Sequence, residues 1–381
     1  MANKTIADHD QAPVVEEARV TTLELFFDLV FVFTITQLTA FLAESLSWEH
    51  LLQSFLIFIV LFWMYGGYAW LTNSVPPVTA GRQLLLIAGM AAFLICALAI
   101  PNAFHETGVA FGIGYLIVIL VHGAMYVRAV GWKAARFVPM NFLSVAVIIT
   151  AGFVNGPARY ILWILAIGLH VLTSFLGTGL TFEIRVSHFV ERHGLLLLVA
   201  LGESILAIGA GSFELDVQFI LAAIMGLILT AALWWIYFAR DDEVARATML
   251  ARSGSARLRQ ALGAYFYAFI PMLFGIILLA TGIHSSIEHL TSSLEPADAF
   301  AFGSGVGLYL LGTTVFRRAS GIPGLNYRYI ASGLAVLTGF IGTNLYAGLQ
   351  FAGLILILVI LILVEAHWSR AEGSVDGASA L

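Results

Sequence analysis

The chain has 381 residues, of which 60% are apolar and 11% are charged, and its mean hydropathy is +0.94. Soluble proteins carry about 45–50% apolar and about 25% charged residues, so this composition excludes an ordinary soluble fold and indicates a polytopic membrane protein. The net charge of −5, with scattered basic residues, argues against nucleic-acid binding, and the single Cys96 excludes an intrachain disulfide and a cysteine zinc site. We expect no cofactor.

Apolar segments of about 20 residues, the length that crosses a bilayer, recur along the whole chain. A hydropathy window predicts an all-α protein with about twelve transmembrane helices and no soluble domain. The predicted helices lie near residues 23–43, 51–71, 83–101, 108–127, 138–154, 159–177, 194–211, 217–238, 260–282, 297–316, 328–346 and 349–367.

The basic residues test this number of helices, because Lys and Arg accumulate in cytoplasmic loops. With twelve helices, 17 of the 18 basic residues fall on one side of the membrane and only Arg159 falls on the other. A miscount by one helix would scramble this asymmetry. The sequence therefore predicts that both termini are cytoplasmic.

The two halves of the chain share a pattern that predicts an internal duplication of six helices. Arg19 precedes Asp28 by nine residues, and Arg192 precedes Glu203 by eleven. Because six is an even number, the two copies would be parallel repeats. We divide the chain into a cytoplasmic tail, a first half, a cytoplasmic amphipathic connector, a second half and a flexible tail, which cover residues 1–22, 23–177, 178–193, 194–367 and 368–381.

Asp28 and Glu203 are acids within long apolar segments, where a carboxylate costs about 2.5–3.5 kcal/mol on insertion scales. Glu203 would lie near the middle of the membrane, because its apolar run starts at His193. If the halves are duplicated, the two acids occupy equivalent positions, and we predict that they form one proton or cation site. The alternative for Asp28 is a pairing with a buried arginine, asparagine or hydroxyl that fixes helix packing.

Four further residues are weaker candidates for ion or proton binding. Thr21 and Glu24 fit a capping box at the start of a helix, so a structural role competes with ion binding by Glu24. Ser204 lies beside Glu203 and offers an oxygen ligand. His122 and His170 are candidates for a proton relay, with hydrogen-bonded packing as the alternative.

Other polar segments have structural interpretations. His188, Glu191 and His193 do not match the spacing of zinc-binding helices, so we expect no metal there. The segment 240–259 is interpreted as a solvated cytoplasmic helix, with a lipid or partner contact as the alternative, and Glu365 is expected to reach water. The glycines of 303–307 are expected to serve close helix contact.

Three motifs resemble one known family. They are Glu24-Leu25-Phe26-Phe27-Asp28-Leu29-Val30-Phe31-Val32-Phe33, His188-Phe189-Val190-Glu191-Arg192-His193-Gly194 leading into Leu201-Gly202-Glu203-Ser204, and Trp234-Trp235-Ile236-Tyr237-Phe238. Over nearly the whole chain, the sequence is similar to the low-temperature-requirement A family of bacterial membrane proteins. The resemblance implies a many-helix protein of the bacterial plasma membrane and assigns no reaction.

Three classes of function fit these features. The first is a transporter or channel whose buried carboxylates handle a proton or cation, with membrane lipids and a small solute as partners. The second is a scaffold, sensor or regulator of stress adaptation that transports nothing. The third, a membrane enzyme, is disfavoured because the extracellular loops gather few catalytic groups, so we expect no enzyme activity. The sequence is compatible with an oligomer.

Overall fold

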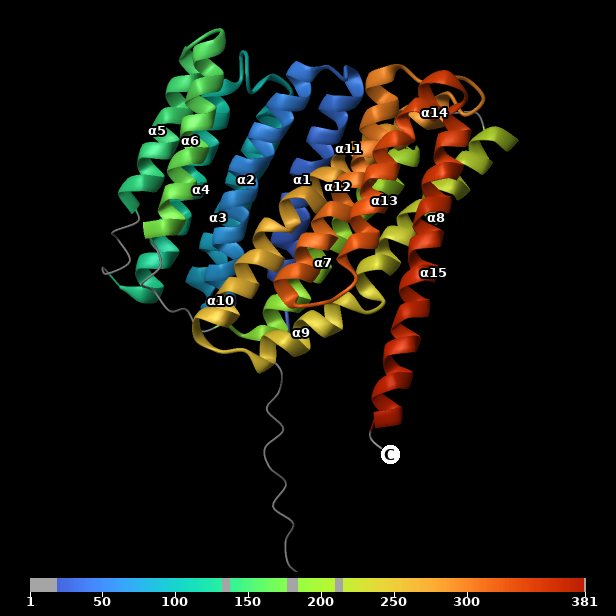
Figure 1. Ribbon diagram of the computed structural model, residues 1–381. Helices are drawn as coiled ribbons and strands as arrows, with labels where there is room; N and C mark the ends of the chain where they lie inside the picture. Colours follow the sequence, from blue (N-terminus) through green and yellow to red (C-terminus); the bar gives the residue numbers. More distant parts are fainter. Residues whose placement is uncertain (1–18, 132–137, 177–183, 210–214, 380–381) are drawn as a thin grey trace, which may run out of the picture.

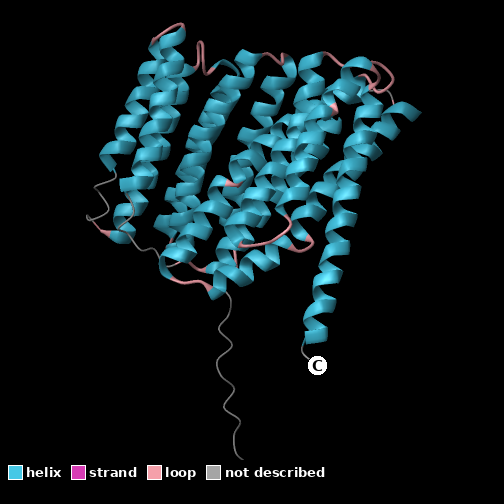
Figure 2. Cartoon of the chain, viewed as in Figure 1, coloured by secondary structure: helices cyan, strands magenta, loops and turns pink. Residues whose placement is uncertain are grey.

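The computed structural model describes residues 19–131, 138–176, 184–209 and 215–379, and the regular structure in these residues is entirely helical (Figures 1 and 2). The helices are α1 (Thr22–Glu44), α2 (Trp48–Ser74), α3 (Ala80–Ala99), η1 (Ile100–Asn102), α4 (Gly108–Val130), α5 (Val138–Phe153), α6 (Pro157–Leu176), α7 (Val186–Leu206), η3 (Ala207–Gly209), α8 (Val217–Phe238), α9 (Asp241–Ala251), α10 (Gly254–Leu262), the π-helix η4 (Gly263–Tyr267), α11 (Phe269–Glu288), α12 (Pro296–Ser320), α13 (Leu325–Leu337), α14 (Gly339–Asn344) and α15 (Ala347–Ser379).

In the ranges that the structure describes, each of the twelve predicted segments overlaps helix, and the longest helices are apolar enough to cross a membrane. Among the described residues, nine helical segments have the length and composition of a membrane span. The helices α5 and α6 contain shorter apolar segments, and the eleventh predicted range is divided at Thr338 between α13 and α14. The chain is therefore an all-α polytopic membrane protein.

The two halves of the chain pack in a corresponding order. In the first half, α1 contacts α2 and α3, α3 contacts α4, α4 contacts α5, and α2 contacts α6. In the second half, α7 contacts α8 and α11, α11 contacts α12, α12 contacts α13, and α8 contacts α15. The halves meet where α1 contacts both α7 and α11, near the middle of the bundle in Figure 1.

Glycines bring α11 and α12 into close contact. Gly275 and Gly282 are seven residues apart on α11, as are Gly305 and Gly312 on α12. A Cβ atom added at Gly282 would lie 2.6 Å from the Cα atom of Phe302, and one added at Gly305 would overlap a backbone nitrogen of α11. The expected use of glycines in 303–307 for close helix contact is confirmed.

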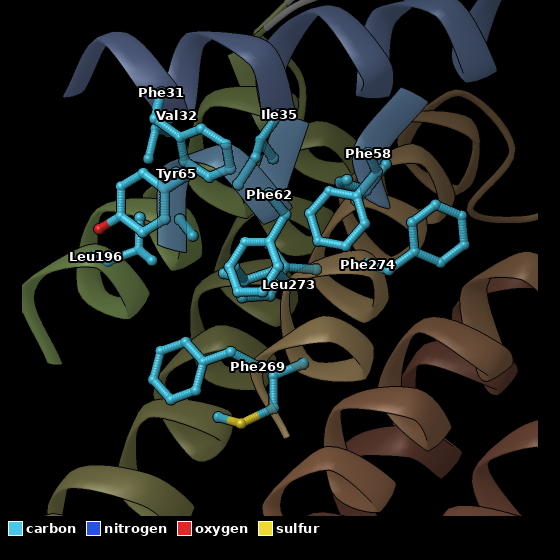
Figure 3. Packing of buried hydrophobic residues seen from close by; sticks show 14 of the residues in the cluster. Phe31, Val32, Ile35, Phe58, Phe62, Tyr65, Leu196, Phe269, Leu273 and Phe274 are labelled. Atoms are coloured by element: carbon cyan, nitrogen blue, oxygen red, sulfur yellow. The ribbon is translucent and has the colours of Figure 1, made fainter. Parts of the chain in front are cut away.

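The centre of the bundle is apolar. Figure 3 shows side chains of α1, α2, α7 and α11 packed together, and the ring centroids of Phe31 and Tyr65 lie 4.3 Å apart in a stacked arrangement. The labelled side chains are buried. A polar group in these surroundings has no water to bond with, so it must find partners within the protein or bind an ion.

Candidate functional site

Two polar clusters lie along the contact between α1 and α7. The Asp28 cluster lies near the start of both helices, where Asp28 pairs with Arg192, and the Glu203 cluster lies further along, where Thr36 bonds to Glu203. Because the contacts occur in the same order on both helices, α1 and α7 run parallel to each other. This arrangement lets two segments more than 160 residues apart in the chain build both clusters.

Glu24 belongs to the Asp28 cluster and also caps α1. Its backbone N–H donates to the Thr21 hydroxyl at 3.3 Å, and its carboxylate accepts the Thr21 backbone N–H at 3.0 Å, which confirms the predicted capping box. The same carboxylate accepts a bond of 3.3 Å from the Arg192 guanidinium and lies 3.2 Å from Nε2 of His188. The side chain thus joins the helix cap to the contact with α7.

Asp28 is held by a guanidinium and a phenol. The Arg192 Nη2 donates to Oδ1 of Asp28 at 2.9 Å, and the Tyr65 hydroxyl donates to the same oxygen at 3.0 Å. Arg192 also donates to the Thr72 hydroxyl, and its guanidinium carbon lies 5.7 Å from the ring centroid of Phe27. Pairing with a buried arginine, the alternative considered for Asp28, is therefore the arrangement present.

The protonation of His188 follows from its neighbour Asn73. The Asn73 side-chain oxygen accepts the backbone N–H of Arg185, and its amide nitrogen donates to the Arg185 carbonyl, so backbone groups fix the orientation of the amide. The same amide nitrogen lies 3.0 Å from Nδ1 of His188 and donates to it. These contacts assign to His188 the neutral tautomer whose proton lies on Nε2 and points to Glu24.

The Asp28 cluster holds more acids than bases. With both acids ionised and His188 neutral, two carboxylates face the Arg192 guanidinium. Arg185 lies at the edge of the cluster, where its guanidinium donates to the backbone carbonyls of Thr72 and Asn73. Because Arg192 bonds to both carboxylates and to Thr72 on α2, the cluster holds α1, α2 and α7 together.

Glu203 has a different environment. Its side chain is buried, and its Oε2 accepts a hydrogen bond of 2.7 Å from the Thr36 hydroxyl. Within the described ranges it forms no salt bridge. Ser204 beside it and Thr39 on α1 are also buried, and their hydroxyls have no hydrogen-bond partner there. Glu203 is thus a buried acid that accepts a hydrogen bond from one hydroxyl and has no basic partner in the part of the chain that the structure describes.

The structure does not place Asp28 and Glu203 in one site. Thr36, the partner of Glu203, lies eight residues beyond Asp28 on α1, which is about 12 Å along the helix axis. Buried apolar side chains of both helices, including Phe31 and Leu196, occupy the interval (Figure 3). The two acids share a helix pair, and each has its own surroundings.

Part of the predicted connector is helical and buried. The helix α7 begins at Val186, and His188, Arg192 and His193 are buried, so an amphipathic surface segment reaching to residue 193 is incorrect. Residues 178–183 lie outside the described residues. With this earlier start, Glu203 falls in the last turn of α7 and not near its midpoint. In the described part of the chain, no three His, Cys, Asp or Glu side chains are placed to hold a metal ion.

The two candidate relay histidines lie on α4 and α6 of the first half. Nε2 of His170 on α6 lies 2.6 Å from the Tyr115 hydroxyl and 2.9 Å from the Ser144 hydroxyl. His122 on α4 packs against Tyr68, with ring centroids 5.2 Å apart. No hydrogen bond among the described residues links either histidine to Asp28 or Glu203; His170 is hydrogen-bonded within the first half, and His122 packs against aromatic rings.

A second charge network, which sequence reasoning missed, joins α9, α12, α13 and α15. Arg317 lies 2.7 Å from both Asp241 and Glu365, and Arg328 lies 2.9 Å from Asp241 and 2.8 Å from Glu365. The segment 240–259 is helical and mostly exposed or half-buried, as expected, but Asp241 within it is buried, and the Glu365 side chain, which is 16% exposed, reaches water while pairing with both arginines. The only sequence signal was that all four residues lie at or just beyond helix ends that the predicted topology places on the same side of the membrane.

The fold and these clusters define a class: a polytopic helical membrane protein that pairs most of its buried charges internally. The chain matches the model of the family described as Bacterial low temperature requirement A protein (LtrA) over residues 19–366, and it belongs to this family, as the motifs predicted.

One relative comes from Rhizobium meliloti (strain 1021) and carries the name Uncharacterized protein RA0937. It is 28% identical over 325 residues, which cover 80% of this chain and 78% of the relative. No solved structure is significantly similar to the chain.

Proposed function

We propose that this protein is a proton- or cation-handling transporter or channel of the bacterial plasma membrane, and that Glu203 is the residue that binds the ion. The observation that carries the proposal is the burial of this carboxylate beside a hydroxyl donor, without a salt bridge to any described residue. An unpaired carboxylate in an apolar interior is unstable, so it takes up a proton or a cation.

The Asp28 cluster has a supporting role in this proposal. Arg192 already compensates Asp28 and bonds to Glu24, so these acids are less available to a mobile ion than Glu203 is. The cluster holds α1, α2 and α7 together at one end of the contact that carries Glu203. An ion can thus bind to Glu203 and leave it while the Asp28 cluster keeps α1, α2 and α7 in place.

The membrane topology is also part of the proposal. We propose twelve crossings, two parallel six-helix repeats and cytoplasmic termini. The corresponding order of helix contacts in the two halves supports the repeat, and the placement of 17 of 18 basic residues on one side supports the orientation. Exposed apolar side chains such as Leu227, Leu356 and Ile360 support contact with lipid.

The test is flux into liposomes that contain the purified protein and a pH-sensitive dye, with a panel of cations outside. We expect the wild type and Glu106→Gln, which alters an exposed acid, to carry a flux that Glu203→Gln lacks. Asp28→Asn should retain a flux when the protein remains folded. Equal flux in the wild type and Glu203→Gln would overturn the assignment of the ion to Glu203.

A scaffold or sensor is the second candidate, and the extensive internal pairing of charges favours it. Both arginines of the second network contact two acids, as Arg192 does in the Asp28 cluster. Such pairing suits a rigid body. The absence of flux for every cation tested, from protein shown to be folded and inserted, would favour this candidate over transport.

A further inference from the structure

We infer that Glu203 and four hydroxyls of α1, α7 and α8 form a binding site for a monovalent metal cation of the Na⁺ class. The inference rests on the proposed function in one respect, since it takes Glu203 as the ion-binding residue, and it names the class of ion. Four observations support it. The Thr36 hydroxyl has two possible acceptors, and the buried hydroxyls of Thr39 and Ser204 have no hydrogen-bond partner among the described residues. The position of Thr230 and the charge of the site are the other two.

Thr36 is able to turn its hydroxyl proton away from Glu203. Its oxygen lies 2.7 Å from Glu203 Oε2 and 3.4 Å from the backbone carbonyl of Val32 one turn earlier. When the proton points to the Val32 carbonyl, the hydroxyl oxygen and the carboxylate both present lone pairs to the same space. A helix thereby supplies a neutral oxygen ligand without exposing any unpaired donor.

Thr39 and Ser204 add two hydroxyls that lack partners. Thr39 follows Thr36 by three residues on α1, so the two side chains lie on the same face, one turn apart. Ser204 is adjacent to Glu203 on α7. Both hydroxyls are buried, and neither has a hydrogen-bond partner among the described residues. Buried polar atoms without partners are rare in folded proteins and require a reason.

Thr230 on α8 also has a buried hydroxyl without a hydrogen-bond partner among the described residues, and it lies at the same depth in the bundle as Ser204. The Cβ position of Gly226 on α8 is 2.9 Å from the side chain of Ile208, which fixes where α8 passes the end of α7. Ser204 lies one turn before Ile208, and Thr230 lies one turn after Gly226. Because α7 and α8 are antiparallel neighbours, Ser204 and Thr230 lie at the same depth in the bundle. Thr230 is buried and its hydroxyl has no partner in the described chain.

The charge and ligand type select the ion. Glu203 is the single carboxylate among these residues, so its charge balances one positive charge and does not balance a divalent ion. The donor atoms are oxygens, which suit hard cations and not the softer transition metals. A proton would neutralise Glu203 and leave the hydroxyls without partners, whereas a metal cation accepts lone pairs from several oxygens at once.

The test is equilibrium binding of radioactive Na⁺ to the full-length protein in lipid nanodiscs, with choline replacing Na⁺ at constant ionic strength. We expect saturable binding that Li⁺ competes for, and its loss in Glu203→Gln. Thr39→Val and Ser204→Ala should each weaken binding about tenfold, because each removes one oxygen ligand. Size-exclusion profiles identify any variant that fails to fold.

Two matched controls are available. Thr34→Val alters a buried α1 hydroxyl that already donates to the Phe31 carbonyl at 2.6 Å, and Glu106→Gln alters an exposed acid; both should bind Na⁺ as the wild type does. Unchanged binding in both Glu203→Gln and Ser204→Ala, or no saturable binding of Na⁺, Li⁺ or K⁺, would overturn the inference. Proton flux without metal binding would overturn it and leave the proposed function standing, while binding without flux would do the reverse.

Discussion

Arg192 on α7 and Asp28 on α1 form a buried ion pair of 2.9 Å, although 164 residues of sequence separate them. Arg192 also bonds to Glu24, one turn before Asp28 on the same face of α1. The Arg192 guanidinium therefore bonds to two successive turns of α1. This contact sets the register of α1 against α7, and hence the position of Thr36 beside Glu203.

Removal of Arg192 should destabilise the protein strongly. In Arg192→Gln, Glu24 and Asp28 lose their shared cation while remaining buried, and breaking a buried pair in this way costs about 3–5 kcal/mol. The measurement is thermal or denaturant unfolding in detergent micelles. The double variant Arg192→Gln with Asp28→Asn should recover part of the loss, and a full additive loss would contradict direct pairing.

The neutral state of His188 depends on the Asn73 amide. In Asn73→Asp, the nitrogen that donates to Nδ1 of His188 becomes an acceptor, so the ring must carry protons on both nitrogens to keep its two contacts. Nitrogen NMR of selectively labelled histidine should report a neutral ring protonated on Nε2 in the wild type and a doubly protonated ring in the variant. A doubly protonated His188 in the wild type would contradict the deduced state.

The second charge network should hold α15 against the bundle. Glu365→Gln leaves Arg317 and Arg328 facing Asp241 alone, which weakens the contact of α15 with α12 and α13. We expect faster proteolysis within the C-terminal part of α15 and a loss of stability of a few kcal/mol, with Na⁺ binding retained because Glu203 lies in another cluster. Glu295→Gln, at an exposed acid, is the control.

The contact between α11 and α12 should not tolerate a side chain at Gly305. Gly305→Ala places a methyl group against the Leu279 backbone, and overpacking of this kind costs about 1–3 kcal/mol. Gly333→Ala on α13 is the matched control, because no atom lies within 4 Å of its added Cβ. Unfolding midpoints compare the two variants, and equal stability would show that the helices separate easily.

Local sequence patterns predicted the elements of this fold well. Each helix long enough to cross a membrane contains about 20 predominantly apolar residues, and hydropathy records that property directly. The capping box of Thr21 and Glu24 was predictable for the same reason, since both partners lie within one helical turn. The family was predictable because its motifs are continuous stretches of sequence.

Partners across the bundle were not predictable from one sequence. Nothing near Asp28 indicates that its cation is Arg192, and the spacing from Arg19 to Asp28 suggested one site shared with Glu203, which the structure does not place together. The ion pairs of Asp241 and Glu365 were missed because hydropathy treats a charged residue identically whether or not an arginine lies beside it. The start of α7 was placed late because His188, Arg192 and His193 are polar, although they are buried.

The distance along the chain between α1 and its partner in α7 has a consequence for biosynthesis. A ribosome makes Asp28 long before Arg192, and at roughly 5–20 residues per second the intervening chain takes on the order of ten seconds or more to complete. During that interval, α1 must enter the membrane with its acids uncompensated. We therefore expect the newly made first helix to remain beside the insertion machinery until α7 emerges, which makes the assembly of the two halves an ordered process.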